Sequence, residues 1–279
     1  MLSYSTFGRH GLGNQLFQYA FLRTTARRLG TKFYCPPWLG DQVLALDDAS
    51  ERAPAPAGIS RSYIQPHRSC GFDELSLGIA DHTEIDGHFQ SPRFWTEPDD
   101  VRRWFAFRPE SVAAVMARYG HIAFEDCAHL HIRFGDLDHR VRYYRPAERY
   151  YRTAIARART RSVLVFSDDP KRARHVLRRL DAALTFVEGN RAYEDLFLMS
   201  QCRAHVGSGS TFSWWGAWLA APPDTTVIVP REGATRPGNP VTARDFWDPT
   251  WIQLPALSGF ADGYRLRATM RTLKRRLLG

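Results

Sequence analysis

Short apolar runs alternate with longer stretches of helical periodicity over the second half of the chain. The apolar runs end at Gly, Ser or Asp, which is typical of buried strands that lead into loops. Strands are predicted at 128–134, 162–169, 183–189, 204–210 and 225–230, and helices at 146–160, 170–180, 193–202 and 212–221. This alternation predicts a parallel sheet with helices on both faces, and ligands bind such sheets at the carboxyl ends of the strands.

The first half of the chain has a less regular pattern. A Gly-rich turn opens a predicted helix over residues 11–30, and Gly30 closes it. A loop rich in Pro and Ala follows at 49–62, and a strand-like piece with a turn follows at 86–95. A boundary between residues 109 and 127 is the expected division into two α/β domains.

Length and composition bound the class of protein. The chain has 279 residues, which leaves room for two domains of about 100 to 150 residues each. Its net charge of +9 favours nucleic acid, anionic lipid or phosphorylated small molecules as partners. The four cysteines are scattered without metal-ligand spacing, so we expect reduced thiols in a cytoplasmic protein. The sequence shows no evident secretory signal and no apolar stretch long enough for a bilayer.

Two polar motifs lie where a ligand is expected. In "HIRFGD" (131–136), the planar fork of Arg133 can pair with a phosphate, and the alternative is an ion pair between Arg133 and Asp136. In "GLGNQ" (11–15), glycines allow a ligand to approach the backbone, and the following helix offers free N–H groups to an anion. An ordinary helix entry is the alternative for this second motif.

Two further motifs follow predicted strands. Asp168 and Asp169 precede Pro170, so one of them is expected to cap a helix, which leaves the other for a ligand such as a purine edge. Ser210 and Thr211 stand between a strand and a helix, where they and the backbone N–H groups form a phosphate cradle. No Lys follows these glycines, so the motif is not a Walker A loop. The tryptophans of this segment are predicted to pack in the core; they are Trp214, Trp215 and Trp218.

Other chemistries have little support in the sequence. No Ser lies in a G-x-S-x-G elbow, and the sequence contains no C-x-x-C motif. No pair of carboxylates stands alone in a loop as a metal–nucleotide site usually requires, so no metal ligands are predicted.

These motifs, in this order, resemble the family 11 glycosyltransferases, the α-1,2-fucosyltransferases. The matching stretches include "GLGNQLFQYA" (11–20), "DGHFQSPRFW" (86–95), "HIRFGD" (131–136), "FSDD" (166–169) and "DLFLMSQCRAHVGSGSTFSWWGAWL" (195–219). The resemblance implies a GT-B fold with an N-terminal Rossmann-like domain over 1–120 on the acceptor side and a C-terminal one over 121–279 on the donor side. It also implies inverting transfer from GDP-fucose to a glycan hydroxyl, without a metal or other cofactor.

The resemblance also implies roles for individual residues. It places His131 and Asp168 or Asp169 at the guanine base. The residues that it places at the diphosphate are Arg133, Ser210, Thr211 and Phe212. Those that it places along the cleft from the other domain are Gly13, Asn14 and Gln15.

The departing diphosphate needs fixed donors in the absence of a metal, and Arg133 is the expected catalytic cation. Asp136 and His10 are candidates for a general base by their chemistry alone. The chain departs from the family pattern at Phe134, where a second Arg is usual, and at His10, where a Gly is usual. The first departure removes a cation near the donor, and the second alters the acceptor side.

The basic segments allow other partners. Arg and Tyr alternate over 140–161, but no nucleic-acid motif accompanies them, so we expect a solvated face and no nucleic acid. The tail at 264–279 carries a stripe of Leu and Met among basic residues. This tail is expected either to dock on the anionic inner face of a membrane, which would suit a lipid-linked glycan acceptor, or to pack across the domains.

Two alternatives to fucosyl transfer are kept open. A GT-B enzyme that uses another nucleotide sugar or linkage would have the same phosphate-binding motifs. A non-catalytic nucleotide- or glycan-binding protein is suggested by the absence of the second Arg at position 134.

Overall fold

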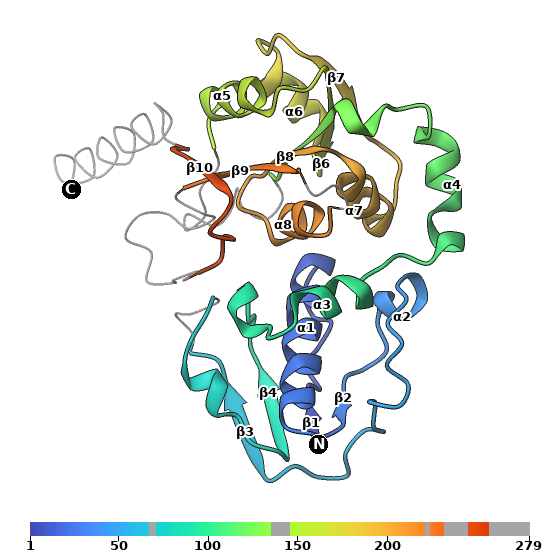
Figure 1. The fold of residues 1–279 in the computed structure, drawn as a ribbon, viewed down its shortest axis with the longest axis vertical. Coiled ribbons are helices and arrows are strands. Elements are labelled where there is room, and N and C mark those ends of the chain that lie inside the picture. The colour runs from blue at the N-terminus through green and yellow to red at the C-terminus, as the bar shows by residue number, and fades with distance from the viewer. Residues whose placement is uncertain (67–70, 135–145, 221–223, 232–244, 257–279) are drawn as a thin grey trace, which may run out of the picture.

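The computed structural model describes residues 1–66, 71–134, 146–220, 224–231 and 245–256, and its two parallel sheets lie one above the other (Figure 1). The basic tail at 264–279 lies outside the described residues, as does the first part of the Arg- and Tyr-rich segment. Cys35, Cys127 and Cys202 are buried free thiols, as predicted, and the fourth cysteine is outside the described part of the chain.

The N-terminal sheet is four-stranded and parallel, in the order β2-β1-β4-β3. Its strands are β1 (Leu2–Ser3), β2 (Phe33–Tyr34), β3 (Arg61–Ile64) and β4 (Thr83–Asp86). The other elements of this half are α1 (Leu12–Arg28), α2 (Leu39–Val43), α3 (Pro98–Trp104), α4 (Pro109–Tyr119) and three 3₁₀ turns, η1 (Leu75–Gly78), η2 (Pro92–Phe94) and η3 (Phe124–Asp126). The strand expected over 86–95 is wrong: β4 ends at Asp86, Phe89 has a φ of +49°, which a strand residue does not adopt, and Pro92 starts a 3₁₀ turn.

The helix predicted over 11–30 is present as α1. It is buried over most of its length, so its apolar residues occur on all sides instead of along one stripe. Gly30, just beyond its end, has a φ of +63°, a left-handed conformation that Gly adopts without the steric cost of a side chain. Helix α1 therefore has a defined start and end near the surface, and its middle lies in the core of the N-terminal half.

The C-terminal sheet is six-stranded and parallel, in the order β10-β9-β8-β5-β6-β7. Its strands are β5 (Cys127–Ile132), β6 (Ser162–Ser167), β7 (Ala183–Phe186), β8 (Ala204–Val206), β9 (Thr226–Pro230) and β10 (Ile252–Leu254). Its helices are α5 (Glu148–Ala158), α6 (Pro170–Leu177), α7 (Ala192–Gln201) and α8 (Thr211–Trp218). Every strand and helix predicted between residues 128 and 230 is thereby confirmed within a few residues, whereas β10 was not predicted.

One hydrophobic cluster joins the two halves. Phe17 of α1 packs on Trp214 and Trp215 of α8, with ring centroids 4.6 and 4.9 Å apart. The indole N–H of Trp215 donates to the carbonyl of Gly13 at 2.9 Å. The predicted core role of the tryptophans is confirmed, since all three are at most 4% exposed. This packing fixes α1 against α8, and the division of the chain into domains at residue 120 stays a prediction.

Candidate functional site

The N-terminal ends of α1 and α8 meet where the two sheets face each other (Figure 1). A side-chain carbon added at Gly13 would lie 2.6 Å from the amide nitrogen of Phe212 and 2.7 Å from the carbonyl carbon of Thr211. Only glycine allows this approach, because backbone atoms of a helix cannot move aside for a side chain. Two helix starts are thus held side by side, and each brings first-turn N–H groups and the positive end of its dipole.

The carboxyl end of β5 lies beside the start of α8. The ring of His131 is 5.8 Å from that of Phe212, and its Nδ1 lies 3.3 Å from the hydroxyl oxygen of Ser208. His131 is buried, whereas Arg133, two residues further on, is exposed. The predicted donor residues of the C-terminal half are therefore brought to one edge of the sheet, and their roles stay predictions.

The two aspartates after β6 have different contacts. Asp169 caps α6, since its carboxylate accepts the N–H of Arg172 at 3.0 Å. Asp168 is exposed, and its Oδ1 accepts the N–H of Phe134 at 2.8 Å, which fixes the end of β5. Asp168 is accordingly the carboxylate placed next to the Arg133 segment, while Asp169 has the capping role.

Ser210 caps α8, and its hydroxyl accepts the N–H of Phe212 at 3.2 Å. Thr211 and Phe212 are half-buried at the first turn of this helix. The capping bond uses the oxygen of the Ser210 hydroxyl and the N–H of Phe212, so the O–H of Ser210 and the N–H of Thr211 are the first-turn donors that stay candidates for binding an anion.

The residues predicted to line the cleft from the N-terminal half also have partners. The carboxamide of Gln90 donates to Oδ1 of Asn14 at 2.7 Å. The carboxamide of Gln15 donates to the carbonyl of His10 at 2.6 Å and to that of Gly8 at 3.3 Å. Gln15 therefore fixes the loop before α1, and Asn14 joins α1 to the segment after β4.

The segment after β4 contributes residues that were not among the predicted site residues. His88 lies against His10, with ring centroids 4.9 Å apart, and Gln90 holds Asn14. A usable signal was present, because "DGHFQS" belongs to the stretches that match the family. Asp136, the other predicted base, lies outside the described residues.

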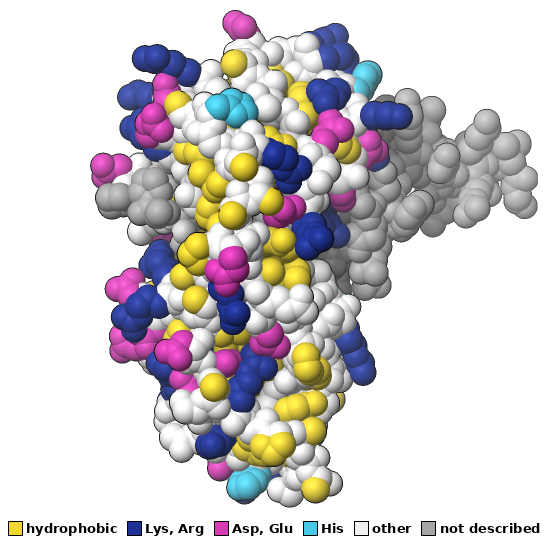
Figure 2. Space-filling view, turned by 90° about the vertical axis from the view of Figure 1, so that its right-hand side faces the viewer, with side chains coloured by type: hydrophobic (Ala, Val, Ile, Leu, Met, Phe, Trp, Pro, Cys, Tyr) yellow, Lys and Arg dark blue, Asp and Glu magenta, His cyan; other side chains and the backbone are white. Residues whose placement is uncertain are grey.

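The described residues contain no cluster of three or more His, Cys, Asp or Glu side chains that could hold a metal ion. None of the described helices combines the length and the apolar character that crossing a membrane requires. On the face drawn in Figure 2, basic and acidic side chains are interspersed and form no basic stripe.

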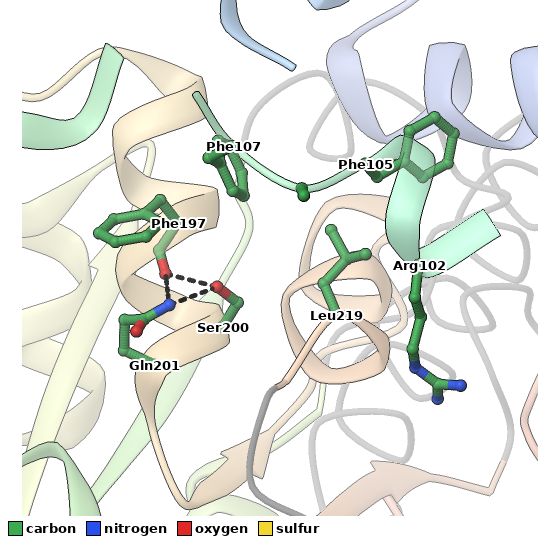
Figure 3. A pocket seen from close by; sticks show the side chains of 8 residues that line it. Arg102, Phe105, Phe107, Phe197, Ser200, Gln201 and Leu219 are labelled. Atoms are coloured by element: carbon green, nitrogen blue, oxygen red, sulfur yellow. Dashed lines mark hydrogen bonds between the residues drawn. The ribbon is translucent and has the colours of Figure 1, made fainter. Parts of the chain in front are cut away.

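A separate pocket of about 240 Å³ lies at the segment that connects α3 to α4 (Figure 3). Its lining residues are Arg102, Phe105, Ala106, Phe107, Phe197, Ser200, Gln201 and Leu219. The polar groups of Ser200 and Gln201 hydrogen-bond to each other and to the carbonyl of Phe197. This pocket contains none of the predicted site residues.

Phe134 is buried in the core of the C-terminal half, and the guanidinium of Arg172 lies 4.6 Å from the centre of its ring. A cation from α6 therefore stands near the position at which the family pattern has its second Arg. An arginine at position 134 would place its charge in a buried site and next to the like charge of Arg172. We expect Phe134→Arg to lose about 3 kcal/mol of stability and to gain no activity.

Thermal melting and transfer rates measured on Phe134→Arg and Phe134→Leu check this expectation. The leucine variant keeps an apolar side chain of similar size, so it is expected to melt close to the wild type. An arginine variant that melts normally and binds donor more tightly would contradict the expectation.

Three buried histidines make the fold sensitive to acid. Nδ1 of His205 lies 2.7 Å from Nδ1 of His129, an arrangement in which one ring donates and the other accepts. Burial lowers the pKa of His129 and of His131 to about 3, and it lowers the pKa of His205 as well. All three histidines are therefore neutral in the folded protein at pH 7.

The unfolded chain binds protons at these histidines near pH 6.5, where the folded chain does not. Above that pH the histidines are neutral in both states and do not lower the free energy of unfolding. Between pH 6.5 and pH 3, the free energy of unfolding falls by about 1.4 kcal/mol per pH unit for each histidine. We expect melting temperatures recorded from pH 8 to pH 4 to fall below pH 6.5. The double variant His129→Leu and His205→Leu should show a shallower fall, and an equal slope would contradict this account.

The sequence and the fold of this chain match known proteins. Residues 79–254 match the family described as Glycosyl transferase family 11. The chain is 32% identical to an α-1,2-colitosyltransferase of Escherichia coli over 49% of this chain and 51% of that protein. It is 35% identical to the O-antigen biosynthesis glycosyltransferase WbnK of Escherichia coli over 32% of this chain and 30% of that protein. These matches cover about half the length or less of either relative.

Solved structures of low sequence identity have the same fold. The fucosyltransferase NodZ from Bradyrhizobium has a TM-score of 0.52 at 14% identity, over 77% of this chain and 90% of that one. POFUT1 in complex with GDP-fucose has a TM-score of 0.53 at 10% identity, over 82% of this chain and 97% of that one. The predicted GT-B-type α/β fold is confirmed. The family match spans more than half of the sequence, and the chain belongs to glycosyl transferase family 11.

Proposed function

We propose that this chain is an inverting glycosyltransferase that moves fucose from GDP-fucose to a glycan hydroxyl and forms an α-1,2 linkage. The observation that carries the proposal is the contact of Gly13 with the first turn of α8, beside the end of β5. We place a nucleoside diphosphate at these two helix N-termini, with Arg133 after β5 as its charged side-chain ligand. The α-1,2 linkage is supported by the name of the colitosyltransferase relative, and the donor by the GDP-fucose held in the POFUT1 structure.

The chemistry of the step suits these groups. As the bond between sugar and phosphate breaks, negative charge collects on the departing GDP and positive charge on the anomeric carbon. Arg133 and the N–H groups of α8 stabilise the departing diphosphate without reorganising, which is the main requirement of a metal-independent transfer. The acceptor oxygen then attacks from the face opposite to the diphosphate, and the configuration at the anomeric carbon is inverted.

Transfer of colitose is the second candidate. The colitosyltransferase relative carries the same α-1,2 linkage in its name with a different sugar. A diphosphate-binding edge does not distinguish sugars, so donor choice depends on the groups that face the sugar ring. The name of the WbnK relative supports an O-antigen glycan as acceptor. We further propose a lipid-linked acceptor at the cytoplasmic face of the membrane.

A transfer assay tests the proposed function. The chain is incubated with GDP-fucose and a galactose-terminated acceptor, with and without EDTA, and parallel reactions contain UDP-sugars. The proposal predicts a fucosylated product whose linkage to galactose O2 is shown by NMR and whose rate is unaffected by EDTA. Turnover with UDP-sugars alone would contradict it, and so would binding of GDP-fucose without transfer or hydrolysis across a broad set of acceptors.

A further inference from the structure

Two histidines stand together at the carboxyl edge of the N-terminal sheet. His88 follows β4, which ends at Asp86, and His10 belongs to the loop between β1 and α1. Their rings are 4.9 Å apart and inclined by 49°. His10 is exposed and His88 is half-buried, so the pair lies at the surface of the sheet edge where α/β proteins bind ligands.

The backbone on either side of this pair is fixed by glutamine side chains. Oε1 of Gln65, just after β3, accepts the N–H of His88 at 2.8 Å and that of Phe89 at 3.0 Å. The carboxamide of Gln15 holds the carbonyl of His10. Both imidazoles are thus carried on backbone whose position is set by the fold, which is typical of groups that must present a fixed geometry to a ligand.

The imidazole of His88 has an unused hydrogen-bonding atom. Its Nδ1 is buried and has no hydrogen-bond partner among the described residues. Burial and the nearby His10 lower the pKa of His88, and Asp86 acts in the opposite direction. His88 is therefore neutral at pH 7 and able to accept a proton, and the Asp86 carboxylate is placed to stabilise the imidazolium that would form.

The pair is connected to the donor edge by a short path of contacts. Gln90, two residues beyond His88, holds Asn14 of α1. Asn14 is adjacent to Gly13, which touches the first turn of α8. The histidines thus lie on the N-terminal side of the same junction at which the C-terminal half is proposed to hold the diphosphate.

We propose that His10 and His88 form the acceptor subsite, and that His88 is the general base of the transfer. This inference rests on the proposed function. The acceptor O–H gives its proton to the imidazole of His88 while the oxygen forms a bond to the anomeric carbon. The bond from that carbon to the donor phosphate breaks, and its electron pair leaves with the nucleoside diphosphate. His10 acts as a positioning residue that keeps the imidazole of His88 in place.

The test compares wild type, His88→Gln, His88→Phe and the control His121→Gln, which alters an exposed histidine after α4. Binding of GDP-fucose is measured by calorimetry, and kcat/KM for transfer is measured from pH 5 to pH 9. Both His88 variants should bind GDP-fucose within about twofold of wild type and lose about 100-fold in kcat/KM. The wild-type rate should fall below pH 6.5, and this acidic limb should be absent in His88→Gln.

The control variant should match wild type in rate and in pH profile. A His88→Gln variant that keeps the wild-type rate and the acidic limb would overturn the assignment. An acidic limb of the wild-type rate that is unchanged in both His88 variants would overturn it as well, whatever the stability of the variants. Failure of the wild-type chain to bind GDP-fucose is a separate result, since it contradicts the proposed function itself.

Discussion

Arg133→Ala is expected to lose about 100- to 1,000-fold in transfer rate while it melts at the wild-type temperature. Arg133 is exposed at the end of β5, so its removal leaves the core intact. In the proposed function, its planar fork meets the charge that develops on the diphosphate. Steady-state kinetics with GDP-fucose and a thermal melt measure the two effects.

Arg157→Ala is the matched control, because Arg157 is an exposed arginine of α5 with no place in the proposed site. Its loss lowers the net charge by the same amount and is expected to leave the rate unchanged. If Arg133→Ala keeps the wild-type rate, or if both variants lose activity equally, Arg133 is not the ligand of the diphosphate.

Gly13→Ala is expected to lower both stability and activity. The added carbon would lie within 3 Å of three backbone atoms of Thr211 and Phe212, so α1 and α8 must move apart. Overpacking of this kind costs about 1–3 kcal/mol. Displacement of the start of α8 from the donor is expected to lower the transfer rate by about 100-fold.

Gly11→Ala provides the comparison within the same turn. No atom lies within 4 Å of a side-chain carbon built at Gly11, and its φ of −62° suits any residue. Melting temperature and kcat/KM are therefore expected to match those of wild type. Equal losses in the two variants would show that the glycines act through loop flexibility, instead of through the contact between α1 and α8.

Most of the C-terminal half could be predicted from the sequence, because most of its strands and helices carry a clear pattern of buried apolar residues. β5 is buried along its whole length, and β6 is buried except at its two terminal serines. In contrast, β10 has three residues, of which two are exposed, so it leaves no pattern to detect. In the N-terminal half, β1 and β2 have two residues each, and their pairing depends on residues far apart in the sequence.

The candidate site was predictable to the extent that its residues follow strands. The motif after β6 indicated that one aspartate caps a helix and that the other is left for a ligand. In the structure, Asp169 is the cap. The contacts of His88 and Gln90 join segments more than 70 residues apart, and no local pattern contains such information. The position of Phe134 beneath Arg172 likewise depends on how α6 packs.

The most direct test of the central claim is a crystal structure of the chain with GDP. We expect the diphosphate at the first turn of α8, within hydrogen-bonding distance of the hydroxyl of Ser210 or the backbone N–H of Thr211 and of the side chain of Arg133. Nucleotide bound elsewhere, for example in the pocket between α3 and α7, with the start of α8 unoccupied, would contradict the account.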